Sequence, residues 1–262
     1  MKNILLKDRL AFALDVSMEK APEIPEIIET IGGEVGWVKM NFIFISAFVL
    51  LAEKGINLFS LIKAKGAKIW LDLKWMDIPN TVAGYVSASK GLGIDMFNVH
   101  ALGTIAMMKA AIDKRKEVFG DDPDKRPLST AISILTSIDQ DALNNELKIP
   151  GSVADLVKVL AHNAKQAGCD CMVASMHEAE MIKNTCGEDF LVITPAMRFI
   201  EELQTDKRDQ KRLGIPADAM DAGADIIVMG SSLIKGGLPA VRRAYAEIEE
   251  GLERRARRMQ AV

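Results

Sequence analysis

Near-continuous apolar runs of strand length alternate with helical stretches along the chain, and this alternation constrains the fold more than any other feature. Strands buried on both faces lack the in–out alternation of half-exposed strands, so such runs indicate a parallel sheet covered by helices. The runs are Leu10–Val16, Val35–Asn41, Lys68–Lys74, Met96–Ala101, Leu128–Leu135, Cys171–Ser175, Phe190–Ala196 and Ile226–Gly230. Eight strands, each followed by a helix, predict a (β/α)8 TIM barrel of the α/β class.

The helical stretches between the strands include Thr104–Phe119 and Val153–Ala167. In the second stretch apolar residues recur at helical spacing, and Ser152 is placed to cap its N-terminus. A doubly wound open sheet is the alternative fold. It would usually have fewer strands, and no Gly-x-Gly-x-x-Gly motif follows the first strand here.

Length and composition indicate one catalytic domain over residues 1–262, because barrels of this size commonly form one domain and no stretch resembles a linker. Hydrophobic residues make up 49% of the chain but aromatic residues only 5%, so aliphatic side chains must fill the core. The basic stretch Leu252–Arg258 lies in a C-terminal tail of about residues 252–262, and we expect it to be a solvated last helix.

Charge and cysteine content favour a cytoplasmic protein that binds neither nucleic acid nor membranes. The net charge is only −3, and the N-terminus lacks the unbroken apolar core of a signal peptide. The longest uncharged apolar run, Met40–Ala52, is shorter than the roughly 20 residues that span a bilayer. Three cysteines do not indicate a disulfide framework, and we expect them to be reduced core residues rather than ligands of a metal.

Charged residues in a strand that should be buried point to a functional site. Asp72 and Lys74 are two residues apart, so both side chains face the same side of the strand Lys68–Lys74, near its C-terminal end. Barrel enzymes place their chemistry at that end. Buried charges must be paired, and breaking such a pair commonly costs about 3–5 kcal/mol. Asp77 follows in the loop, and a structural ion pair is the alternative interpretation.

A second buried strand strengthens the functional interpretation. Lys39 lies near the end of Val35–Asn41, which should neighbour the strand that carries Asp72. We therefore predict an array of Lys39, Asp72, Lys74 and Asp77, in which the charges perturb one another's pKa values. Asp15 ends the first strand, where it could hold a sugar hydroxyl or simply cap the next helix.

The motif Asp72-x-Lys74-x-x-Asp77-Ile-Pro-Asn-Thr81 resembles the signature of the orotidine 5'-phosphate decarboxylases. The similarity covers almost the whole chain. Its other parts are Leu14-Asp15, Lys39, Asn98-Val-His-Ala101, Leu135-Thr136-Ser137, Thr194-Pro195 with Arg198, and Asp209-Gln210. The resemblance implies decarboxylation of orotidine 5'-phosphate to UMP, without a cofactor or metal, by a homodimer.

The same resemblance implies individual roles. Lys74 would protonate C6 of the pyrimidine, Asp72 would press on the substrate carboxylate, and Lys39 would orient Asp72. The resemblance also assigns the ribose to Asp15, the base to Thr136, the phosphate to Arg198, Gln210 and the Gly230 backbone, and a shared role across the dimer to Asp77 and Thr81. The loop from Met197 to Asp209 is a candidate lid.

Three departures from the family pattern lie near the expected ligand. Ser231 stands where family members usually have a phosphate-gripping arginine, and it offers one neutral hydrogen bond in place of a bidentate charged contact. Ala196 and Asn41 stand where glycine is usual. We expect weakened phosphate binding at Ser231, unless Lys207, Arg208 or Lys235 compensates.

Two rival functions remain at this point. Sister barrels that act on sugar phosphates use Mg²⁺ held partly by a glutamate at the end of strand two, where this chain has Lys39, which would repel the ion. A catalytically inactive binding barrel is the other rival, supported by the missing arginine. The four buried charges argue against it, because an inactive site has no reason to retain them.

Overall fold

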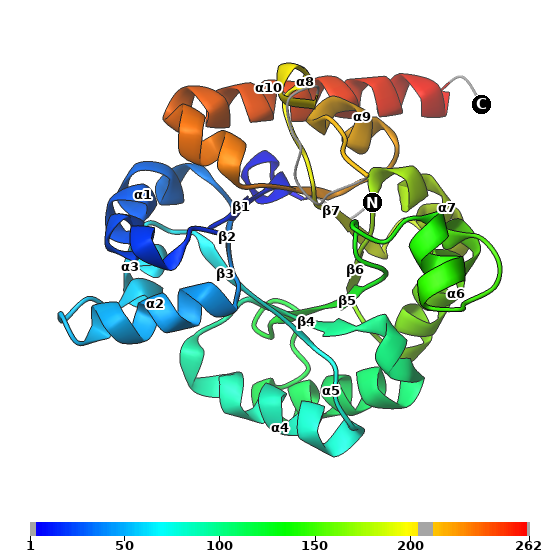
Figure 1. Cartoon of the computed structure of the whole chain (residues 1–262), viewed down its shortest axis with the longest axis horizontal. Coiled ribbons are helices and arrows are strands. Elements are labelled where there is room, and N and C mark those ends of the chain that lie inside the picture. The colour runs from blue at the N-terminus through cyan, green and yellow to red at the C-terminus, as the bar shows by residue number, and fades with distance from the viewer. Residues whose placement is uncertain (1–3, 204–211, 261–262) are drawn as a thin grey trace.

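The computed structural model describes residues 4–203 and 212–260. Its strands are β1 (Leu10–Ala13), β2 (Trp37–Met40), β3 (Lys68–Trp75), β4 (Met96–His100), β5 (Leu128–Ile132), β6 (Cys171–Val173), β7 (Leu191–Thr194) and β8 (Ile226–Met229). Each strand pairs in parallel with the next, and β8 closes on β1. Figure 1 shows the resulting ring of strands with helices around it. The prediction of a (β/α)8 barrel is confirmed, and the open-sheet alternative is excluded by this closure.

The helices form the outer layer. They are α1 (Ile24–Ile31), α2 (Phe42–Ala52), α3 (Leu58–Ala64), α4 (Pro79–Ala88), α5 (Thr104–Phe119), α6 (Val153–Ala167), α7 (Met176–Cys186), α8 (Ile200–Leu203), α9 (Pro216–Asp221) and α10 (Ser231–Gln260). Both α5 and α6 have the predicted bounds, and Ser152 caps α6 in a capping box with Asp155. Within the described residues, no helix is both long and apolar enough to cross a bilayer.

Two apolar clusters form the core. Side chains from the outer faces of the strands pack against the helices, as Phe12, Leu71 and Phe97 do. A smaller cluster fills the barrel interior and includes Trp37 and Trp70. Alternation along each strand separates the two clusters, because successive side chains of a strand point to opposite faces. The filled interior leaves the mouth of the barrel for chemistry.

The expectation of a solvated C-terminal tail is only partly correct. Residues 252–260 do continue α10, but Arg255 is just 7% exposed and its guanidinium donates to Glu188 at 2.7 Å. Arg258 likewise pairs with Glu180 and donates to the Asp221 carbonyl. The basic residues therefore attach this helix to the barrel, where acidic partners distant in the sequence face them.

Candidate active site

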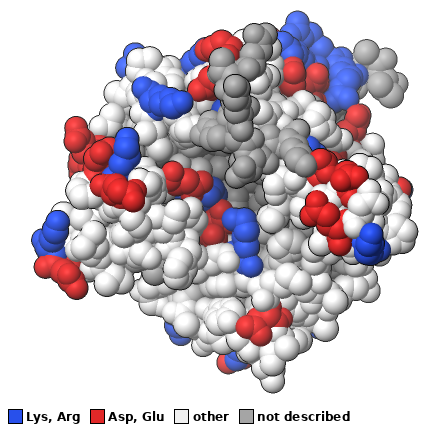
Figure 2. Space-filling model, viewed as in Figure 1, with Lys and Arg blue, Asp and Glu red and all other residues white. Residues whose placement is uncertain are grey.

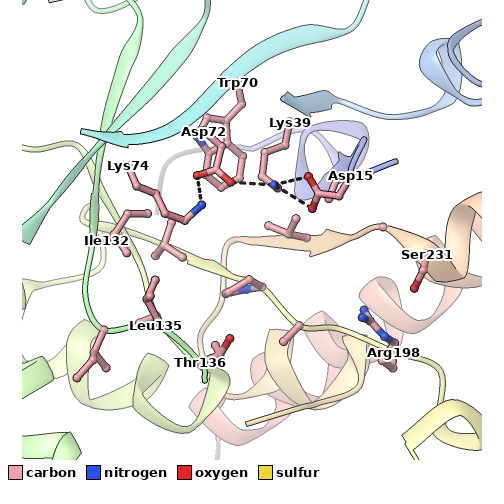
Figure 3. A pocket seen from close by; sticks show the side chains of 18 residues that line it. Asp15, Lys39, Trp70, Asp72, Lys74, Ile132, Leu135, Thr136, Arg198 and Ser231 are labelled. Atoms are coloured by element: carbon pink, nitrogen blue, oxygen red, sulfur yellow. Dashed lines mark hydrogen bonds and ion pairs between the residues drawn. The ribbon is translucent and has the colours of Figure 1, made fainter. Parts of the chain in front are cut away.

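The C-terminal ends of the strands surround a cavity of about 430 Å³. Among the predicted site residues, eight line it: Asp15, Lys39, Asp72, Lys74, Thr136, Arg198, Gly230 and Ser231. Figure 3 shows that Asp72 and Lys74 lie on one side of the cavity, and that Arg198 and Ser231 lie together on another. The cavity therefore has the paired lysines and aspartates on one side and the Arg198 guanidinium on another.

The charges form one continuous chain of ion pairs. Lys39 Nζ lies 2.8 Å from Asp72 Oδ2 and 3.3 Å from both Asp15 carboxylate oxygens. Lys74 Nζ donates to Asp72 Oδ1 at 2.8 Å. Register explains the proximity, because Lys39 pairs with Trp70 on β3 and Ala13 on β1 pairs with Lys39. Two ammonium groups therefore hold the Asp72 carboxylate from both sides.

Burial and charge act in opposite directions on these groups. Burial disfavours the charged form of Lys39, but Asp72 and Asp15 outweigh it, so the pKa of Lys39 is raised. Burial also disfavours the Asp72 carboxylate, which is 6% exposed, yet Lys39 and Lys74 hold the pKa of Asp72 well below its usual range. Asp72 is thus a fixed negative charge at neutral pH, and it faces the cavity.

Asp77 and Thr81 do not join this array within one chain. The Asp77 carboxylate accepts hydrogen bonds from the Ile78 amide and the Tyr85 hydroxyl, and neither Asp77 nor Thr81 lines the cavity. The fourth charge that converges in the chain is Asp15. The capping alternative for Asp15 is not what the structure shows, because Ser17 occupies the N-cap of the next helical turn.

The backbone of β3 changes course at Lys74. Leu71 pairs with Phe97 and Trp75 with Val99, so β3 holds two more residues than β4 between these pairs. Lys74 takes a φ of 49°, in the left-handed region. The side chain of Asn98 contacts both this backbone and Asp72. Sequence reasoning gave Asn98 no individual role, although a polar residue in the apolar run Met96–His100 is a detectable signal.

The departures from the family pattern have structural counterparts. Asn41 Nδ2 donates to Asp15 Oδ1 at 2.9 Å, and its Oδ1 accepts the Ile43 amide. Ala196 has a φ of 67°, a conformation that favours glycine. Of the possible substitutes for a phosphate-binding arginine, Lys235 is exposed and does not line the cavity. Lys207, Arg208, Asp209 and Gln210 lie outside the described residues, as does the second half of the candidate lid.

The end of β2 carries an ammonium group where the rival barrels would need a metal ligand. Lys39 lies between the Asp15 and Asp72 carboxylates and pairs with both. Within the described residues, no group of three or more His, Cys, Asp or Glu side chains could hold a metal ion. The carboxylates at this mouth are therefore neutralised by lysines of the chain itself.

The closed barrel, the cavity at its mouth and the paired lysines and aspartates together define a (β/α)8 barrel with an enzyme-type site at the C-terminal ends of its strands. Residues 8–245 match the family model described as "Orotidine 5'-phosphate decarboxylase / HUMPS family". The chain belongs to this family.

Proteins and structures similar to the chain cover nearly its full length. The orotidine 5'-phosphate decarboxylase of Heliobacterium modesticaldum is 36% identical over 251 residues, 95% of this chain and 99% of that protein. That of Trichlorobacter lovleyi is 38% identical over 249 residues, 94% and 98% of the two chains. A crystal structure of orotidine 5'-phosphate decarboxylase from Lactobacillus acidophilus superposes with a TM-score of 0.70 at 30% identity, covering 94% of this chain and 98% of that one.

Proposed function

We propose that this chain is a carboxy-lyase that converts orotidine 5'-phosphate to UMP and CO2, the last step of de novo pyrimidine nucleotide biosynthesis. The observation that carries the proposal is the ionised Asp72, buried at the cavity and held between the ammonium groups of Lys39 and Lys74. Family membership and the names of the relatives support the same activity.

The array suits the charge changes of this reaction. Loss of CO2 breaks the bond between C6 and the carboxyl carbon and leaves the electron pair on C6. Asp72 repels the substrate carboxylate and so favours this loss, whereas the Lys74 ammonium stabilises the developing negative charge and then donates its proton to C6. Lys74 can reach a ligand because its side chain is 41% exposed at the cavity. These residues supply the chemistry without a cofactor.

The rest of the cavity holds the substrate. We assign the ribose to Asp15 and Lys39, the base to Thr136, and the phosphate to Arg198, the Gly230 backbone and Ser231, with Gln210 added from the resemblance. The phosphate is remote from C6, so its binding energy can hold the carboxylate against Asp72 in the ground state. The separation of Arg198 from Lys74 across the cavity fits this division (Figure 3).

We also propose a homodimer in which Asp77 and Thr81 complete the neighbouring subunit's site. Large apolar side chains are exposed around the mouth on α2 and on the segment from β3 to α4, including Phe42 at 71%, Met76 at 55% and Ile78 at 67%. Figure 2 shows few charged atoms on this part of the face. Exposed apolar surface of this kind is typical of a protein interface.

The remaining parts of the proposal rest on composition. We propose that the chain is one catalytic domain in the cytoplasm and that it binds no nucleic acid. The three cysteines are buried thiols, which suits a reducing compartment. The near-neutral net charge of −3 gives the chain no general attraction for polyanions.

The activity is tested by following the ultraviolet change as orotidine 5'-phosphate becomes UMP. We expect turnover in the presence of EDTA, and a loss of at least about 1000-fold in kcat for Lys74→Ala because proton donor and electrostatic stabilisation are both removed. Lys109→Ala, at an exposed ion pair on α5, is the matched control and should be unaffected. EDTA-sensitive turnover of a sugar phosphate would favour the Mg²⁺-dependent rival. A parent without turnover that still binds UMP would favour the inactive barrel.

A further inference from the structure

We propose that Asn98 on β4 is a positioning residue, whose amide holds Asp72 and Lys74 in the geometry that the reaction requires. This inference rests on the proposed decarboxylation. Asn98 does not line the cavity and has an exposed fraction of 0%, so it reaches a substrate only through other residues. Its two hydrogen bonds nevertheless go to the two residues at the centre of the charge array.

The contacts of Asn98 fix the orientation of its amide. Nδ2 donates to Asp72 Oδ1 at 2.5 Å, and Oδ1 accepts the backbone N–H of Lys74 at 2.7 Å. An ionised carboxylate only accepts and a backbone N–H only donates, so a flipped amide would lose both bonds. Asn98 is therefore bound at both ends, and no other orientation of its amide satisfies both partners.

The Lys74 amide donates its hydrogen bond to the Asn98 side chain, at a point where the regular pairing of β3 with β4 is interrupted. Because β3 gains two residues relative to β4 between Leu71 and Trp75, the backbone of Lys74 is out of step with the regular ladder. A bulge of this kind redirects a side chain. The left-handed φ of 49° at Lys74 is unfavourable for a residue with a Cβ and persists only when its surroundings enforce it. The Asn98 carbonyl supplies one such restraint.

The bond to Asp72 completes the set of donors around its carboxylate. Oδ1 accepts from Lys74 Nζ at 2.8 Å and from Asn98 at 2.5 Å, whereas Oδ2 accepts from Lys39 at 2.8 Å. Donors from three strands thus fix the plane of the carboxylate. Because the amide group of Asn98 carries no charge, its hydrogen bond restrains the Asp72 carboxylate without screening the negative charge from the substrate.

Asn98→Leu and Asn98→Asp are the informative variants. Leucine is similar in size and removes both hydrogen bonds. Aspartate keeps an acceptor for the Lys74 amide, but when ionised it faces Asp72 with a like charge. Thr130→Val is the matched control, because Thr130 is the β5 partner of Asn98, is equally buried, and its hydroxyl has no hydrogen-bond partner among the described residues.

We expect Asn98→Leu to lower kcat by about 100-fold, the scale of effect that a small misplacement of catalytic groups produces. The dissociation constant for UMP should stay within about threefold of the parent's, since no ligand contact is lost. Thr130→Val should match the parent in both measurements. A kcat for Asn98→Leu that equals the control's, or a loss of UMP affinity as large as the loss of kcat, would overturn the positioning role.

The dependence of kcat on pH in Asn98→Asp is a second, independent test. It can be made even if Asn98→Leu does not fold. A protonated aspartic acid has a donor and an acceptor, as asparagine has, so kcat relative to the parent should rise as pH falls. The titratable groups near this position are Lys39 on β2, Asp72 and Lys74 on β3, and His100 on β4. All are present in the parent, so dividing by the parent's profile leaves the change that the new carboxyl group introduces, including its effect on these neighbours. A relative kcat that is independent of pH would contradict the proposal.

The crystal structure of Asn98→Leu separates this inference from the proposed function. If the parent does not decarboxylate orotidine 5'-phosphate, the proposed function fails, but the geometric claim is still tested. We then expect Lys74 to leave the left-handed region or Asp72 to rotate away from Lys74 Nζ. An unchanged Lys74 backbone and Asp72 side chain in the variant would overturn the role of Asn98.

Discussion

At the scale of single residues, Ser231 gives a direct prediction about substrate binding. It begins α10 and lines the cavity beside Arg198 (Figure 3). We predict that Ser231→Arg lowers KM for orotidine 5'-phosphate by about 10-fold, because a charge-assisted contact to phosphate is worth roughly 1.5–3 kcal/mol. Gln166→Arg adds the same charge at an exposed position of α6 and should leave KM unchanged. Equal KM values for parent and Ser231→Arg would show that phosphate binding is already complete.

Ala196 is a residue-scale case in which the departure affects stability. Its φ of 67° is accessible to glycine without strain, whereas a Cβ makes it unfavourable. We predict that Ala196→Gly raises the free energy of unfolding by up to about 1 kcal/mol. Ala110→Gly, inside α5, should lower it by roughly the same amount. Urea denaturation of both variants checks the signs, and a destabilised Ala196→Gly would contradict the prediction.

The sequence predicted the charged residues of the site better than their local geometry. Lys39, Asp72 and Lys74 were detectable because charges are rare in strands buried on both faces. The left-handed backbone of Lys74 and the contacts of Asn98 were not, since they depend on a register shift between β3 and β4. Asp77 was expected to join the array, with the resemblance placing it across a dimer, and that stays a prediction; within the chain Asp15 pairs with Lys39 instead. Sequence spacing does not fix which way a loop carboxylate turns.

At the scale of elements, apolar runs located every strand but overestimated where most of them end. The run Leu128–Leu135 continues three residues beyond β5, and Leu10–Val16 three residues beyond β1. Ile134 and Leu135 follow β5 and line the cavity. Hydrophobicity reports burial, and at the barrel mouth burial continues after the ladder of hydrogen bonds has stopped. Strand bounds therefore needed the register, which the sequence alone does not contain.

One buried ion-pair network connects three elements at the opposite end of the barrel. Asp170, just before β6, accepts two bonds from Arg126 at 2.9 and 3.0 Å, pairs with Arg115 of α5, and accepts the Ser129 amide of β5 at 2.8 Å. Burial opposes ionisation of Asp170, but Arg126 and Arg115 outweigh it and lower its pKa from 3.8 to about 2. The network is remote from the catalytic cavity, so it contributes to stability.

We predict that Asp170→Asn lowers the free energy of unfolding by about 3 kcal/mol at pH 7, because it leaves buried guanidinium groups without a counter-charge. The folded-state pKa is depressed, so the parent's stabilisation is complete above about pH 4 and is lost as pH falls towards about 2. The difference in the free energy of unfolding between parent and variant should therefore become smaller as the pH falls. Urea denaturation at pH 7, 4 and 3 measures it.

A surface carboxylate provides the control for this prediction. Asp113 forms an exposed pair with Lys109 on α5, and its side chain is 57% exposed. Asp113→Asn should change the free energy of unfolding by less than about 0.5 kcal/mol at each pH. If Asp170→Asn lowered the free energy of unfolding by the same amount at pH 3 as at pH 7, the loss would come from packing rather than from charge.

At the scale of the whole molecule, the barrel separates stability from chemistry. The Asp170 network joins elements at the N-terminal ends of the strands, whereas the cavity and the lysine–aspartate array lie at the C-terminal ends. The exposed side chains of Phe42, Met76 and Ile78 follow the C-terminal ends of β2 and β3, on the cavity side of the barrel. A partner that covers this apolar surface would therefore also stand over the catalytic cavity.

A subunit-mixing experiment tests whether that partner is a second copy that lends Asp77. In a shared site, Lys74 of one chain works with Asp77 of the other. A dimer of one Lys74→Ala chain and one Asp77→Ala chain then has one site with both defects and one intact site. Random pairing of two inactive variants should restore about a quarter of the parent's activity. Mixing Lys74→Ala with Asp72→Ala is the control, because Asp72 and Lys74 pair within one chain and neither site is repaired. Recovery no greater than in this control would place Asp77 outside the neighbouring site.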